Sequence, residues 1–278
     1  MPNLNKRKIV NGLVFTICGI MSVIAIVPLM SVLIQVTVKG ITAINLDFFI
    51  KLPPSPGAGA GGGLGNAVLG TIYLVGLACV FSIPVGIMAG IYLSEFGKSK
   101  LAFVVRLCSD VLSGVPSIVV GIFVYIILVR TLGTFSALAG GVALAIIMLP
   151  LIVRTTEEML LMVPDSLRNA SLALGATSGE TILKVTIPHA YKGIITGIML
   201  SLARAAGETA PLLFTALSSR YWPGGLMGNT ASLPVYIYNY AISPYDNWQQ
   251  LAWGAAFVLI FMVFLTSLFT RLFGRDIG

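Results

Sequence analysis

Residues 154–192 read RTTEEMLLMVPDSLRNASLALGATSGETILKVTIPHAYK, a polar interruption in an otherwise apolar chain. The stretch holds two short helical patterns, one on each side of Gly175. Apolar segments long enough to cross a bilayer precede and follow it. A helix–Gly–helix element outside the bilayer offers a surface to another protein. The stretch therefore predicts a membrane protein with a docking site for a separate subunit.

The composition excludes an ordinary soluble domain. Of the 278 residues, 57% are hydrophobic and 10% are charged, whereas a soluble domain carries about 25% charged residues. We expect an all-α integral membrane protein, because helices are the default way to satisfy the backbone in lipid. The net charge is +7, and the Lys and Arg residues lie mostly at the ends of the apolar segments. No basic patch is interleaved with aromatic side chains, so we expect lipid and no nucleic acid as a partner.

Six apolar segments approach or exceed the length of about 20 residues that a spanning helix needs. We therefore predict six transmembrane helices, at residues 9–36, 66–94, 101–130, 134–154, 193–217 and 248–273. The first segment follows a basic start, as in a signal peptide. It is longer than a signal sequence and lacks a small-residue cleavage site, so we interpret it as the first spanning helix.

The loop charges predict the orientation. With the amino terminus inside, the inner side carries Lys6, Arg7, Lys8, Lys98, Lys100, Arg106, Arg168, Lys184, Lys192, Arg271 and Arg275. The outer side then carries Lys39, Lys51, Arg130 and Arg220. Because Lys and Arg collect in cytoplasmic loops, we expect both termini of this multi-pass protein in the cytoplasm.

Three regions follow from these segments. Residues 1–36 form the cytoplasmic start and first helix, residues 37–65 an outer Gly/Pro-rich loop, and residues 66–278 a five-helix core with an inner loop at 164–188. The outer segment 218–247 is rich in Tyr and Trp, which suits the headgroup level, and contact with an extracytoplasmic partner is the alternative. Neither a metal site nor a phosphate-binding P-loop is evident, so we expect no cofactor, and ATP hydrolysis would need another subunit.

The inner loop carries recognisable start and stop signals. One helix face is formed by Leu167, Ala170, Ser171 and Leu174 at i, i+3, i+4 and i+7. Gly175 is expected to end this helix in the left-handed conformation. Thr177 and Glu180 form a capping box for a second helix, which we expect Pro188 to end.

Charged residues also occur within or beside the predicted spans. Arg204 and Glu208 lie four residues apart in the fifth span, where a charge costs at least about 2.5–3.5 kcal/mol. They either form a self-contained ion pair, or Arg204 meets a crossing anion that Glu208 helps to hold or release. Arg154 ends the fourth span beside Glu157 and Glu158, and either extends to the inner surface or contacts an anion there.

The inner loop resembles the EAA loop of ABC importer permeases, which follows the pattern E-A-A-x3-G-x9-I-x-L-P. Gly175 and Pro188 match its spacing, whereas Asn169 replaces Glu, Ser171 replaces the second Ala, Val185 replaces Ile and Ile187 replaces Leu. The resemblance implies that the first short helix is a coupling helix seated on an ATPase subunit. The residues that would make this contact are Asn169, Ala170, Ser171, Leu174, Gly175 and Pro188.

Four further blocks resemble the phosphate ABC transporter permeases of the PstA type. They read LSGVPSIVVG at 112–121, LPLIVRTTEEM at 149–159, ARAAGETAPLLFT at 203–215 and IYNYAISP at 237–244. The likeness runs from about Gly65 to the end of the chain and is more specific than the loop pattern. It implies the type I ABC importer (MetI-like) bundle, with Arg154 and Arg204 important for transport.

The resemblance also implies an assembly in a bacterial or archaeal inner membrane. Its other members would be a second permease of the PstC type, two ATPase subunits of the PstB type and an extracytoplasmic phosphate-binding protein of the PstS type. We therefore expect a permease subunit of a phosphate importer rather than an enzyme. An importer of another oxyanion, such as sulfate or molybdate, is the alternative. An ATPase-independent secondary transporter is a weaker one.

Overall fold

The chain forms a helical bundle, as the composition predicts. The computed structural model describes residues 4–57 and 61–273, so Arg275, one of the expected inner-side charges, lies outside the described part. All regular structure in these ranges is helical. Four helices are long and apolar enough to span a membrane alone: α1 (Leu4–Ala43), α3 (Gly65–Glu95), α7 (Ala137–Leu161) and α13 (Asp246–Phe273).

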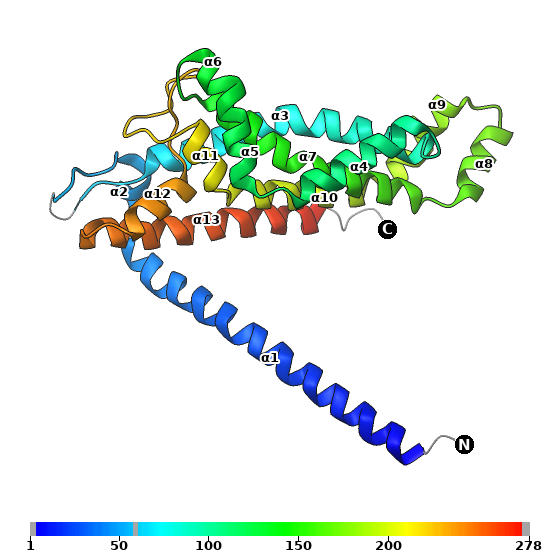
Figure 1. Cartoon of the computed structure of the whole chain (residues 1–278), viewed down its shortest axis with the longest axis horizontal. Helices are drawn as coiled ribbons and strands as arrows, with labels where there is room; N and C mark the ends of the chain where they lie inside the picture. Colours follow the sequence, from blue (N-terminus) through cyan, green and yellow to red (C-terminus); the bar gives the residue numbers. More distant parts are fainter. Residues whose placement is uncertain (1–3, 58–60, 274–278) are drawn as a thin grey trace.

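The centre of the bundle is the pair α3 and α7, which lie side by side (Figure 1). Two glycines of α3 allow this close approach. A β-carbon on Gly86 would lie 2.6 Å from Ile152 Cγ2, and one on Gly90 would lie 2.5 Å from Thr156 Cβ. Small residues at such contacts let two backbones pack closely, which is the usual source of helix association in lipid. The pair therefore forms a rigid frame for the residues that α7 carries.

The predicted span 101–130 is not one straight helix. It consists of α4 (Lys100–Gly114), α5 (Ser117–Val124), a π-helical turn η1 (Tyr125–Val129) and the short α6 (Arg130–Leu132). The two parts meet at an angle of 107°. Val115 is extended, with φ −72° and ψ 130°, because Pro116 disfavours the helical conformation in the residue before it. The predicted span is therefore sharply bent at Pro116.

The predicted span 193–217 is also interrupted. Helix α10 (Ile187–Ala206) ends at Gly207, and the short α11 (Ala210–Thr215) follows, with Pro211 in its first turn. Helix α11 packs against α5, since a β-carbon on Gly121 would lie 2.6 Å from Pro211 Cα. Residues 4–57 and 61–273 thus hold four single spans, or five with the bent pair. Of the six predicted spans, 101–130 is sharply bent and 193–217 is divided between α10 and α11.

Helix α1 diverges from the rest of the bundle (Figure 1). It meets α13 near its carboxyl end, where a β-carbon on Gly40 would lie 2.5 Å from Phe257 Cβ and Lys39 Nζ lies 4.8 Å from the ring centre of Trp253. The helix extends to Ala43, seven residues past the predicted boundary at residue 36. Two short helices lie in the loops expected outside, α2 (Leu46–Ile50) and α12 (Leu233–Ala241).

The inner loop occupies the opposite end of the bundle from α2 and α12 (Figure 1). Its helices are α8 (Asp165–Ala173) and α9 (Ser178–Thr181), and α9 continues through a π-helical turn η2 (Ile182–Thr186) directly into α10. Pro188 therefore does not end the second helix, contrary to the prediction. It lies in the first turn of α10 after the wider π turn, a place where a residue without an N–H group is tolerated.

Candidate functional site

Arg154 and Arg204, 50 residues apart in the chain, line one small cavity of about 120 Å³. We refer to it as the arginine cavity. The bend between α4 and α5 supplies part of its wall, including Ser113 and Ser117, and α7 adds Pro150. Irregular backbone at membrane depth is tolerated where it lines a cavity. The cavity therefore combines two guanidinium groups with hydroxyl groups in an otherwise apolar bundle.

Arg204 lies in the last turn of α10 and remains half exposed. Its Nε is 3.7 Å from Glu208 Oε1, so the expected ion pair forms, although at a distance longer than a hydrogen bond. Glu208 itself follows the end of the helix, beyond Gly207. The Arg204 side chain is 51% exposed and that of Glu208 is 16% exposed. The Arg204 guanidinium group is thus only loosely paired, and Arg204 is among the residues that line the cavity.

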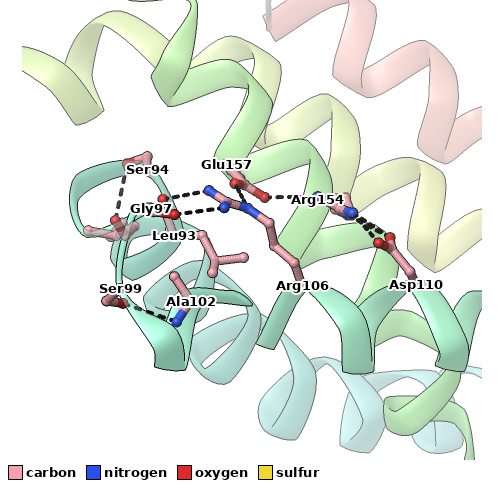
Figure 2. A network of polar contacts seen from close by, with 10 residues as sticks. Leu93, Ser94, Gly97, Ser99, Ala102, Arg106, Asp110, Arg154 and Glu157 are labelled. Atoms are coloured by element: carbon pink, nitrogen blue, oxygen red, sulfur yellow. Dashed lines mark hydrogen bonds and ion pairs between the residues drawn. The ribbon is translucent and has the colours of Figure 1, made fainter. Parts of the chain in front are cut away.

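Arg154 is held by two carboxylates from different helices (Figure 2). Its Nε donates to Asp110 Oδ1 over 3.0 Å and its Nη2 donates to both Asp110 oxygens. Its Nη1 donates to Glu157 Oε2 over 3.2 Å. Sequence reasoning missed Asp110, although an acidic residue within a predicted span is itself a signal of function.

Glu157 is shared between Arg154 and a second arginine, Arg106. Arg106 Nε donates to Glu157 Oε1 over 2.6 Å, and its Nη1 and Nη2 donate to the carbonyl oxygens of Gly97 and Leu93 (Figure 2). We call Arg106, Glu157, Arg154 and Asp110 the α4–α7 ion network. It ties the turn after α3 to α4 and α7, a role that the sequence analysis did not assign to Arg106.

The inner loop has the local geometry that its sequence predicts. Gly175 has a φ of +86°, and its N–H donates to Leu172 O over 3.0 Å, which ends α8. Thr177 and Glu180 form the predicted capping box. The Thr177 backbone N–H, then Lys184 and the Thr177 hydroxyl, lower the pKa of Glu180. The hydrogen bonds to the ionised Glu180 carboxylate therefore stabilise the fold at neutral pH, and this stabilisation is lost as the pH falls through the lowered pKa.

Most of the expected coupling residues face solvent. Asn169, Ala170, Gly175 and Pro188 are exposed, and the Leu174 side chain is 90% exposed. Ser171 differs because it is half-buried, with its hydroxyl 2.9 Å from that of Thr181.

Arg168, which the sequence analysis counted only as a loop charge, fastens α8 to the bundle. It donates to Glu95 Oε1 over 2.6 Å and to Leu160 O over 2.8 Å. The exposed residues of α8 thus stand on a helix joined to the ends of α3 and α7.

Residues 82–278 match the family described as the binding-protein-dependent transport system inner membrane component. The phosphate transport system permease protein PstA of Yersinia pestis is 47% identical over 241 residues, which cover 86% of this chain and 81% of the relative. The PstA of Xylella fastidiosa is 45% identical over 268 residues, covering 96% and 93% of the two chains. The chain belongs to the PstA permease family.

Solved structures support the fold of this PstA-family permease. A chain of the MetNI methionine ABC transporter in inward-facing conformations aligns with a TM-score of 0.59 at 22% identity, covering 77% of this chain and 93% of that one. A chain of a bacterial alginate ABC transporter aligns with a TM-score of 0.68 at 14% identity, covering 98% and 97%. The predicted MetI-like permease fold is confirmed. The chain is accordingly an inner-membrane permease subunit of an ABC transport system rather than an enzyme.

Proposed function

We propose that this chain forms part of the translocation path of an ATP-driven phosphate importer. The observation that carries the proposal is the arginine cavity, in which Arg154 and Arg204 lie together beside Ser113 and Ser117. Guanidinium groups bind oxyanions through paired hydrogen bonds, and hydroxyl groups add further donors. The names of the relatives, which are phosphate transport permeases, favour phosphate over sulfate or molybdate.

The other subunits belong to the same proposal. A second permease of the PstC type would complete the path, two PstB-type ATPases would supply the energy, and a PstS-type protein would deliver phosphate from outside. We place α8 and both termini in the cytoplasm. The first turn of α1 and the last turn of α13 point toward the side of the molecule that holds α8 (Figure 1), and the distribution of Lys and Arg favours that side as the inner one.

Reconstituted uptake tests the proposal. Proteoliposomes would contain this chain, its partner permease and the ATPase, with ATP inside and the binding protein and labelled phosphate outside. We expect ATP-dependent uptake that arsenate reduces and sulfate leaves unchanged. Uptake without ATP would support a secondary transporter instead. An assembled complex that hydrolyses ATP but transports sulfate or molybdate would support the alternative substrates.

Within this proposal, α8 is the coupling helix that receives the motion of the ATPase. Its residues Asn169 and Ala170 are exposed, and Arg168 fixes it to α3 and α7. Helix α7 carries Arg154 two turns before its end. A displacement of α8 would therefore reach the arginine cavity through packed helices, rather than through a flexible linker.

Gly175→Val is expected to uncouple ATP hydrolysis from uptake. A β-branched residue is strained at the left-handed φ of Gly175, so the corner between α8 and α9 would shift. We expect the uptake rate to fall by about tenfold or more, because a strain of about 1–2 kcal/mol disfavours the docked geometry. The measurement is the ratio of phosphate transported to ATP hydrolysed in the same vesicles.

Gly179→Val provides the matched control. Gly179 also lies on the exposed loop with open space around it, but it is part of α9 and its φ is not in the left-handed region. This variant should keep the wild-type ratio. Equal effects of the two substitutions would show that the left-handed corner at Gly175 has no special role in coupling.

A further inference from the structure

Asp110 occupies the edge of Arg154 that a transported oxyanion would need. A guanidinium group binds an oxyanion best through two parallel N–H donors. On Arg154, Nε and Nη2 form such a pair, and both donate to the Asp110 carboxylate. The remaining nitrogen, Nη1, is directed to Glu157. An anion could reach the paired donors of Arg154 after the Asp110 carboxylate has moved away.

The two carboxylates on Arg154 differ in how easily they can move. The Glu157 side chain is 4% exposed and accepts from both Arg106 and Arg154. The Asp110 side chain is 55% exposed in this chain, and among the described residues only Arg154 donates to its carboxylate. Breaking a buried pair leaves an uncompensated charge, whereas breaking an exposed pair costs much less. Glu157 therefore positions Arg154, and Asp110 is the exchangeable partner.

We infer that Asp110 and the transported anion compete for Arg154, so that Asp110 sets how readily the anion leaves the path. The inference rests on the proposed phosphate transport. In the absence of the anion, Asp110 neutralises Arg154, and the α4–α7 ion network of two cations and two carboxylates has no net charge. When the anion binds, the Asp110 carboxylate turns away from Arg154. When Asp110 returns, it releases the anion.

The competition has a physical purpose in an apolar path. Without Asp110, Arg154 would keep only Glu157, whose single negative charge it shares with Arg106. Such an undercompensated cation would bind the anion tightly and release it slowly. A carboxylate that exchanges with the anion lowers the affinity without removing the guanidinium group. Asp110 thus tunes the affinity by competing for Arg154, and it need not contact the anion itself.

Inhibition of uptake by internal phosphate tests this inference. Proteoliposomes with the complete complex, ATP inside and loaded binding protein outside would be prepared with increasing internal inorganic phosphate. Asp110→Asn is expected to lower the internal concentration that halves the initial uptake rate by about fivefold, which corresponds to about 1 kcal/mol of lost competition. Asp110→Glu should stay near wild type. Asp110→Ala replaces Asp110→Asn if the latter fails to assemble.

Glu158→Gln is the matched control, because Glu158 is an exposed carboxylate on the same helix as Arg154 and its replacement changes the charge equally. A merely structural defect would reduce the rate at every internal concentration and leave the half-inhibitory concentration unchanged. The inference would be overturned if Asp110→Asn took up phosphate at the wild-type rate and the internal phosphate concentration that halves this rate were unchanged or raised. No ATP-dependent uptake by the wild-type complex would instead contradict the proposed function.

Discussion

Arg204→Gln is expected to abolish phosphate uptake while the transporter still assembles. The Arg204 side chain is half exposed and lines the arginine cavity, so its removal leaves no large void in the packed bundle. The amide of Gln cannot supply the charge or the forked donors of a guanidinium group. Two charge-assisted hydrogen bonds are together worth about 3 kcal/mol or more. We therefore expect uptake to fall by at least about 100-fold.

The variant would be measured by ATP-dependent uptake in proteoliposomes, with co-purification of the partner subunits as the test of assembly. Arg204→Lys should retain part of the activity, because it keeps the charge but loses the planar fork. Arg130→Gln is the control. Arg130 is exposed at the start of α6, which follows α5 and η1 and is separated by both from the bend that lines the cavity. Uptake at the wild-type rate in Arg204→Gln would remove Arg204 from the proposed path.

Local signals in the sequence predict the inner loop well. The left-handed Gly175 and the capping box of Thr177 and Glu180 each depend on residues within one or two turns. For Pro188 the local rule fails, because the π turn before it lets the helix continue into α10. The tendency of proline to end a helix is a property of a single turn. Here the packing of α10 against α7 outweighs it.

The bend at Pro116 shows why the number of spans could not be predicted from apolar length. A proline in a long apolar segment is compatible with a mild kink or with a sharp change of direction. The contact of Gly121 with Pro211 packs α5 against α11, and these residues are 90 positions apart. Their meeting depends on the whole bundle. The same holds for Arg154 and Arg204, which were each identified as charged residues but not as neighbours of one cavity.

The residues missed at the candidate site share one property. Asp110, Arg106 and Arg168 have partners in other helices, whereas the analysis of the sequence considered pairs at helical spacing. Arg154 has Glu157 at i+3, which is a local pair. Its two-donor contact with Asp110 is long-range. A charged residue in an apolar segment indicates a partner in another helix where no local one is present, because it is rarely left unpaired in lipid.

Glu157→Gln is expected to destabilise the protein more than any other neutralisation in the α4–α7 ion network. Glu157 is 3% exposed and lies between two cations, Arg106 and Arg154. A neutral amide could accept one of the two hydrogen bonds, but it would leave Arg106 without its carboxylate and Arg154 with Asp110 alone. Removal of one member of a buried pair costs about 3–5 kcal/mol. The partial exposure of both arginines, 31% and 34%, favours the lower end, about 3 kcal/mol.

The midpoint temperature of thermal denaturation of the purified complex measures this effect, together with the amount of complex that reaches the membrane. Glu158→Gln removes the same charge from the adjacent, exposed position and should leave the midpoint near wild type. Asp110→Asn should change stability by less than about 1 kcal/mol, since Asp110 is exposed. Equal midpoints for Glu157→Gln and Glu158→Gln would show that the network does not fix Arg154. A large loss of stability in Glu157→Gln would identify Glu157 as the carboxylate that holds Arg154 in place. A change in anion release in Asp110→Asn would identify Asp110 as the carboxylate that exchanges with the substrate.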